Sequence, residues 1–249
     1  VSPLMHAHLA RPARSVKRGA WDMATINGTT GNDVRNGGDE ADDIYGGSGA
    51  DTLSGNGGAD SIFGGSGSDS LYGGEGDDLL DGGTNSDQLF GGNGNDTLIG
   101  GGGNDTLNGG NGTDTASFAG ATANLVVNLV NSSATGEGTD VLTSIENVVG
   151  GSGSDNITGD AGANVLDGGA GNDQLFGGGG NDTLVGGLGN DTLNGGAGFD
   201  TADYSTSATG VTVNLTTGSA TGQGTDTLTS IENVTGSGQA DSITGNSAD

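Results

Sequence analysis

The sequence has no cysteine, only two prolines and few aromatic residues, which make up 4% of its 249 residues. Without cysteine, no disulfide framework stabilises the chain. Both prolines, Pro3 and Pro12, precede residue 23, so no proline interrupts a strand ladder beyond that point. Hydrophobic residues make up only 30%, and no apolar run approaches the roughly 18 residues that a membrane helix needs. Neither a large globular core nor a membrane span is expected.

Basic residues are also scarce, with five Lys and Arg against 32 Asp and Glu, for a formal net charge of −27. Four of the five bases lie within residues 1–22, so from Met23 onward 31 acids face Arg35 alone and the charge is −30. A chain of this charge repels nucleic acids and anionic membranes. We therefore expect cations as partners, with no nucleic acid and no membrane insertion.

No set of residues suited to catalysis is apparent, and we predict that the chain is not an enzyme. Its two histidines, His6 and His8, both lie within residues 1–22, a basic segment that shares no pattern with the rest. No serine in a Gly-x-Ser-x-Gly setting has a histidine available to it. We expect residues 1–22 to be a disordered tail or a non-native extension, and the two histidines to be inert rather than a zinc site.

Glycine is abundant, with 57 residues, and it recurs with a period of nine. Residues 28–117 divide without insertion or deletion into ten blocks of nine, of which residues 91–99, GGNGNDTLI, are typical. The template is G-G-x-G-x-D-x-U-x, with U an aliphatic residue. The first six residues suit a turn, because glycine readily takes positive φ. The last three suit a strand whose middle side chain faces inward, so two blocks make one flattened coil.

The period stops twice, at two spacers that are copies of each other. The segment TSIENV occurs at residues 143–148 and again at 229–234, so the larger repeat is 86 residues long. In each spacer an alternating segment, Leu125 to Val130 and Val211 to Thr216, predicts a strand with one buried face. We expect six regions: a tail at 1–22, a first array at 23–117, a spacer coil at 118–149, a second array at 150–203, a spacer coil at 204–235, and the truncated start of a third array at 236–249.

This template resembles the RTX (repeats-in-toxin) family of hemolysin-type calcium-binding repeats. The resemblance implies an all-β fold, a parallel β-roll or β-solenoid of nine-residue GGxGxDxUx repeats. In such a roll the sixth-place residues form one row along each of two edges. Neighbouring carboxylates within a row would lie about 5 Å apart, and at that distance they repel by roughly 0.8 kcal/mol even in water. Multiple Ca²⁺ ions between them would remove this repulsion, since calcium takes roughly 6–8 oxygen ligands in flexible geometry. The expected ligands are Asp33, Asp42, Asp51, Asp60, Asp69, Asp78, Asp87, Asp96, Asp105, Asp114, Asp155, Asn164, Asp173, Asp182, Asp191, Asp200 and Asp241.

The stacking predicts an upper limit of about twelve ions within the two arrays, one for each gap between successive turns on an edge. Asn164 is the sixth-place residue that is not Asp. Because an amide brings no charge, its site is expected to be the weakest, and Asn164→Asp is expected to tighten it. Four spacer acids are interpreted as parts of a solvated loop and left out of the site: Asp140, Glu146, Asp226 and Glu232.

We predict a secreted, extracellular calcium-binding roll that folds when it binds Ca²⁺, and the resemblance adds a type I secretion exporter as a partner. Two other interpretations stay open. One is a detached C-terminal module of a larger secreted enzyme or pore-forming toxin, which a catalytic or pore-forming domain in the same reading frame would reveal. The other is a structural or adhesive array on the cell surface, which calcium-driven assembly on cells would reveal.

Overall fold

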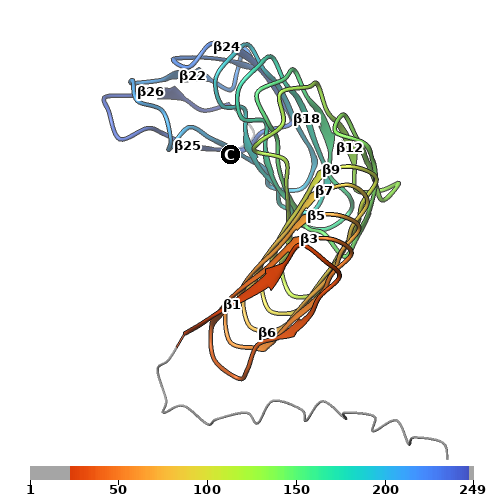
Figure 1. Cartoon of the computed structure of the whole chain (residues 1–249). Coiled ribbons are helices and arrows are strands. Elements are labelled where there is room, and N and C mark those ends of the chain that lie inside the picture. Colours follow the sequence, from red (N-terminus) through yellow and green to blue (C-terminus); the bar gives the residue numbers. More distant parts are fainter. Residues whose placement is uncertain (1–22, 247–249) are drawn as a thin grey trace, which may run out of the picture.

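The computed structural model describes residues 23–246. The expected tail at 1–22, with His6 and His8, lies outside the described residues. Between residues 23 and 246 all regular secondary structure is β-strand, and the strands form two sheets. Figure 1 shows the coils stacked along a bent axis that leads from β1 to β26. Within this part of the chain there is no helix long and apolar enough to cross a membrane.

One sheet has 11 strands and the other 15. The 11-stranded sheet contains, in spatial order, β1 (Ala24–Thr29), β3 (Asp42–Ser48), β5 (Ser61–Ser66), β7 (Leu79–Thr84), β9 (Thr97–Gly102), β11 (Thr115–Ser117), β15 (Asn147–Val149), β17 (Val165–Asp167), β19 (Thr183–Val185), β21 (Thr201–Asp203) and β25 (Asn233–Thr235). The 15-stranded sheet contains β2 (Val34–Asn36), β4 (Thr52–Gly57), β6 (Ser70–Glu75), β8 (Gln88–Asn93), β10 (Thr106–Asn111), β14 (Thr139–Thr143), β13 (Ser133–Thr135), β12 (Val126–Asn128), β16 (Asn156–Thr158), β18 (Gln174–Gly179), β20 (Thr192–Ala197), β24 (Thr225–Thr229), β23 (Ser219–Thr221), β22 (Thr212–Asn214) and β26 (Ser242–Thr244).

Within the arrays, each strand pairs in parallel with the strand one coil later. Ile44 lies beside Ile62 in one sheet, and Leu53 beside Leu71 in the other. These eighth-place side chains meet between the two sheets, where their exposed fraction is 0%. Burial of one aliphatic row per sheet is the apolar contribution to stability. The predicted all-β fold, a parallel roll of nine-residue repeats, is confirmed.

The spacers depart from this parallel order. In the first, β13 runs antiparallel to both of its neighbours, β12 and β14. The spacer thus adds three strands to the 15-stranded sheet but only β15 to the other, and the second spacer does the same with β22, β23, β24 and β25. At a spacing of about 4.8 Å per strand, two extra strands lengthen one sheet by about 10 Å at each spacer. This difference in length accounts for the bend of the stack in Figure 1.

The predicted one-sided strand of the first spacer is confirmed. Leu125, Val127 and Leu129 are buried, whereas Val126 and Val130 are exposed. The buried face joins the same core cluster as the array rows. The two edges of the roll, where the turns lie, are therefore held by one continuous core.

Candidate metal centres

The sixth-place residues lie at the end of each turn, directly before or at the first residue of a strand. Because successive blocks alternate between the sheets, they form one row along each edge of the roll. The row before the 15-stranded sheet contains Asp33, Asp51, Asp69, Asp87, Asp105, Asp155, Asp173, Asp191 and Asp241. The row before the 11-stranded sheet contains Asp42, Asp60, Asp78, Asp96, Asp114, Asn164, Asp182 and Asp200.

Each row is a ladder of hydrogen bonds between coils. The backbone N–H of Asp42 donates to Asp60 Oδ1 at 2.7 Å, and the N–H of Asp60 donates to Asp78 Oδ1 at 2.8 Å. The same bond recurs at each step between aspartates of both arrays. This bond fixes Oδ1 of the carboxylate that accepts it, and it therefore also fixes the position of the second oxygen, Oδ2, of the same carboxylate.

Twelve of these aspartates bury Oδ2 without any hydrogen-bond partner in the described part of the chain. An unpaired buried carboxylate oxygen is strongly unfavourable, because it has lost its water and gained no donor. The observation therefore calls for a ligand at each of these oxygens. The twelve residues are Asp51, Asp60, Asp69, Asp78, Asp87, Asp96, Asp105, Asp114, Asp173, Asp182, Asp191 and Asp200.

The first glycine of each block keeps the space before this oxygen open. A Cβ on Gly46 would lie 2.5 Å from Asp51 Oδ2 and 2.6 Å from the carbonyl oxygen of Gly64 in the next coil. A carboxylate oxygen and a carbonyl oxygen therefore face the same small volume. Calcium accepts both kinds of oxygen in flexible geometry, whereas zinc prefers nitrogen or sulfur. The donor set fits calcium.

Backbone carbonyls must complete any such site. Among residues 23–246 no three His, Cys, Asp or Glu side chains gather into a metal-binding group. Each turn instead contributes one carboxylate and several peptide oxygens, a mixture that hard cations such as calcium commonly use.

Burial raises the pKa of many of these carboxyls. The pKa of Asp87 and that of Asp173 rise to about 7, first because burial disfavours the charged form and then because neighbouring aspartates repel it. Burial also raises the pKa to about 6 in four other carboxyls: Asp60, Asp78, Asp96 and Asp191. A cation beside these carboxylates would favour their charged form and oppose the shift.

Twelve turns share one backbone conformation, and they are the turns that carry the twelve unpaired oxygens. Their second- and fourth-place residues have positive φ, as at Gly92 (121°) and Gly94 (129°). The turns that open each edge of each array differ. There the second-place N–H donates to the sixth-place side chain, as from Gly38 to Asp42 Oδ2 (2.7 Å) and from Thr29 to Asp33 Oδ2 (2.6 Å).

The second array opens in the same way. The N–H of Gly151 donates to Asp155 Oδ2 at 3.0 Å, and that of Asp160 donates to Asn164 Oδ1 at 2.8 Å. In these opening turns a backbone N–H binds the side-chain oxygen that is unpaired in the other turns, and in Asn164 this is the single amide oxygen. Asp241, in the block that follows the second spacer, differs again, because its Oδ1 accepts both the hydroxyl of Ser237 at 2.6 Å and the N–H of Val211 at 2.9 Å.

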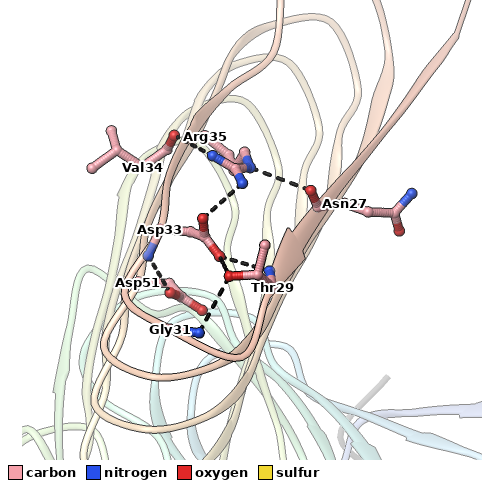
Figure 2. Close-up of polar contacts among 7 residues, drawn as sticks. All are labelled: Asn27, Thr29, Gly31, Asp33, Val34, Arg35 and Asp51. Carbon is pink, nitrogen blue, oxygen red and sulfur yellow. Dashed lines mark hydrogen bonds and ion pairs between the residues drawn. The ribbon is translucent and has the colours of Figure 1, made fainter.

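The first turn carries its own cation. Figure 2 shows the guanidinium of Arg35 beside Asp33, with 2.6 Å between Nη2 and Oδ1. Nε of Arg35 donates to the carbonyl oxygen of Asn27 at 3.3 Å, and Nη1 donates to that of Val34 at 3.2 Å. Arg35 thus takes the place of the N–H that a preceding coil supplies to Oδ1 elsewhere in the ladder. Hydrogen bonds from Thr29 are the main reason that the pKa of Asp33 is lowered.

Asn164 is oriented differently from the aspartates. Its Nδ2 donates to the carbonyl oxygen of Glu146 at 2.7 Å. The residue one coil earlier therefore presents a carbonyl here, where the other coils present an N–H. A carboxylate has no hydrogen to donate to a carbonyl oxygen, so asparagine meets a requirement that the period of nine does not reveal.

The interpretation of Asp140 and Asp226 as acids of a solvated loop is wrong. Their exposed fractions are 4% and 3%. Asp140 Oδ1 accepts the N–H of Asp105 at 3.0 Å, and Asp226 Oδ1 accepts that of Asp191 at 3.1 Å, so both extend the ladder. On the other edge the ladder passes to two glutamates, since Oε2 of Glu146 and of Glu232 accepts an N–H from the last array aspartate.

The two stacked rows of carboxylates and the glycine turns define a metal-binding β-solenoid. A family model described as the RTX calcium-binding nonapeptide repeat (4 copies) matches residues 19–53, 54–89, 81–116, 149–184 and 169–202. These matches cover more than half of the chain, and the chain belongs to this family. Its repeats form a calcium-binding structural unit and not a catalytic fold. No curated protein matches the sequence.

Proposed function

We propose that this chain is a non-catalytic module that binds several Ca²⁺ ions at its turns and folds as it binds them. The observation that carries the proposal is the set of twelve buried carboxylate oxygens without a partner. The ligands are the sixth-place aspartates of the two arrays together with turn carbonyls. The opening residues Asp33, Asp42, Asp155 and Asn164 contribute to the rows, but Oδ2 of the three aspartates and the single side-chain oxygen of Asn164 already accept N–H groups.

Twelve ions in the two arrays follow from the same observation. Eight of the unpaired oxygens lie in the first array and four in the second. The stacked turns leave the same number of gaps, because each of the twelve turns with an unpaired oxygen is separated by one gap from the turn before it on its edge. One ion per gap would give each of these oxygens a ligand.

Folding should depend on the ions because the metal-free roll is electrostatically unfavourable. From Met23 onward the net charge is −30, and the aspartate rows bring much of that charge into two buried lines. The aliphatic rows must also offset about 1–2 kcal/mol of backbone entropy per ordered residue. Ion binding to the folded state alone supplies the missing free energy.

Secretion into a calcium-rich medium belongs to the same proposal. Extracellular calcium modules typically bind at roughly 10⁻⁴–10⁻³ M, so the chain would stay unfolded in a cytosol and fold outside the cell. An unfolded chain suits export by a type I exporter, which family membership suggests as a partner. Expression beside such an exporter, with the chain assayed in the medium, tests this part.

Circular dichroism of the full chain with and without calcium tests the main proposal. We expect a disordered spectrum in chelator and a β spectrum with millimolar calcium. Magnesium is the control ion, and it should induce much less structure because it demands stricter octahedral geometry. A β spectrum that persists unchanged in excess chelator would show that folding does not need the ion.

A further inference from the structure

The first spacer contains a further nonapeptide turn. Residues 135–143 read TGEGTDVLT and end in β14, which pairs in parallel with β10. Residues 135–143 pair with residues 100–108 in the register that two successive array blocks have, since Leu107 lies beside Leu142 and Gly103 beside Gly138. Asp140 stands at the sixth place, and Leu142, at the eighth place, is buried.

The hydrogen bonds between this turn and the turn at residues 100–108 are those found between array coils. The Asp105 N–H donates to Asp140 Oδ1 at 3.0 Å, and the Val141 N–H to the carbonyl of Asp105 at 2.8 Å. The fourth-place N–H, from Gly103, donates to the third-place carbonyl, of Glu137, at 3.2 Å. Residues 135–143 are therefore a nonapeptide repeat that follows its neighbour after 35 residues and has threonine at the first place. The family matches end at residue 116 and resume at 149, so they leave it out.

The second spacer contains the equivalent repeat at residues 221–229, TGQGTDTLT, with Asp226 at the sixth place. The two copies differ in one buried neighbour. In the second copy the hydroxyl of Tyr204 donates to Asp226 Oδ2 at 3.1 Å. In the first copy the residue at the equivalent position is Phe118, which has no hydroxyl. Asp140 is 4% exposed, and no donor within residues 23–246 reaches its Oδ2, which unlike the twelve array oxygens keeps some contact with solvent.

We propose that the turn at residues 135–140 binds an additional Ca²⁺ ion against the turn at residues 100–105, whereas the Tyr204 hydroxyl closes the equivalent site at Asp226. The inference rests on the proposed function of the array turns. Glu137, the third-place residue, is half-buried and lies close enough to Asp140 for their charges to interact. The first copy thus places two carboxylates and no internal donor at the turn, whereas Gln223 replaces the glutamate in the second.

One rule covers the aspartate turns of the two arrays and the two spacer repeats under this proposal. Where the protein donates a hydrogen bond to the second carboxylate oxygen, as Gly38 does for Asp42 and Tyr204 does for Asp226, no ion is required there. Where no donor is present, as at Asp96 and Asp140, an ion takes that place. The Tyr204 side chain is 2% exposed, so packing holds its hydroxyl in position.

The test counts bound ions in the full-length chain by native mass spectrometry at saturating calcium. Asp140→Asn should lose one ion relative to the unchanged chain. Because Oδ1 is fixed by the ladder, asparagine must place its NH₂ group where Oδ2 was, and an amide nitrogen does not ligate calcium. Asp226→Asn is the matched control, and it should keep the full count.

Two further variants add or remove the hydroxyl group that distinguishes Tyr204 from Phe118. Phe118→Tyr should lose one ion by supplying a donor to Asp140, and Tyr204→Phe should gain one at Asp226. Both change only a hydroxyl group, so a folding defect is not expected to obscure the count. Agreement of these four variants with the expected changes would support the proposal.

Asp96→Asn, within the first array, separates this inference from the function on which it rests. If Asp96→Asn loses one ion while Asp140→Asn and Phe118→Tyr keep the full count, the spacer site is refuted and the array function stands. If none of the three loses an ion, the proposed array function is refuted as well. Loss of one ion from both Asp140→Asn and Asp226→Asn would refute the role assigned to Tyr204.

Discussion

Residues 91–96, GGNGND, and residues 150–155, GGSGSD, fit the same template, yet their turns differ. In the first, Gly92 and Gly94 have positive φ and Asp96 Oδ2 has no partner. In the second, the N–H of Gly151 donates to Asp155 Oδ2. The difference lies in what precedes each turn on its edge: an array coil before residues 91–96, and a spacer hairpin before residues 150–155. The conformation of a turn is therefore set by the coil on which it stacks.

Acidification should have the largest effect, because it acts on many interior turns together. The pKa values of Asp87 and Asp173 are raised to about 7, whereas the pKa of Asp33 is lowered by its hydrogen bonds. A raised carboxyl pKa means that the folded state binds the proton more tightly than the unfolded state does. Without calcium, stability therefore rises as pH falls from about 8, and this gain is complete below the ordinary Asp value of about 3.9.

Calcium binding should respond in the opposite direction, since protons compete with the ion for the same carboxylates. We expect the calcium midpoint of folding to rise several-fold between pH 7.5 and pH 5.5. Circular dichroism titrations at a series of pH values measure both effects. A calcium midpoint independent of pH over this range would show that the interior carboxylates do not titrate with raised pKa values.

Substitution of a second-place glycine should show the next largest effect and should separate the two kinds of turn. Gly92 has a φ of 121°, and a Cβ there would collide with the carbonyl oxygen of Gly74. Gly38 occupies the same place in its block, but a Cβ there would meet only Asp42 Oδ2, at 3.8 Å. Gly92→Ala should destabilise the calcium-loaded chain by about 3 kcal/mol, and Gly38→Ala by less than about 1 kcal/mol.

Urea unfolding at fixed calcium measures both glycine variants. Equal losses of stability would mean that the two turns share a conformation in solution. A small loss at both positions would instead show that the interior turn accommodates a side chain by moving away from the preceding coil.

Much of this architecture is predictable from the sequence, because the period of nine fixes which residues turn and which face inward. Ile44 and Leu53 are fully buried as their eighth-place positions require. The turn at residues 135–143 is not predictable in the same way, since it follows its neighbour after 35 residues and lacks the first glycine. It becomes recognisable once β14 is seen to pair with β10. The orientation of Asn164 likewise depends on a carbonyl supplied by another coil.

Asn164→Asp should have a smaller effect, and its direction is the reverse of the one expected from charge alone. The substitution removes the hydrogen bond from Nδ2 to the Glu146 carbonyl and turns a carboxylate oxygen toward that carbonyl. We expect a loss of about 1–2 kcal/mol in unfolding free energy, the usual effect of leaving a buried polar group unpaired. The ion count should not rise, which native mass spectrometry can check. An added ion with unchanged stability would restore the interpretation of Asn164 as a weakened calcium ligand.

The smallest effect is expected at the first turn, where a side chain takes the part of the cation. Arg35 is 30% exposed in its pairing with Asp33, and exposed pairs of this kind contribute little to stability. Arg35→Gln keeps a donor but removes the charge, so unfolding by urea at low salt should show a small loss of stability and a smaller one at high salt. Arg35→Lys is the matched control, because it retains the charge while losing the planar group that reaches Asn27 and Val34. If Arg35→Gln gained a calcium ion at Asp33, the guanidinium would have been excluding one; if the count stayed constant and only the salt dependence changed, its part would be to neutralise the exposed end of the aspartate row.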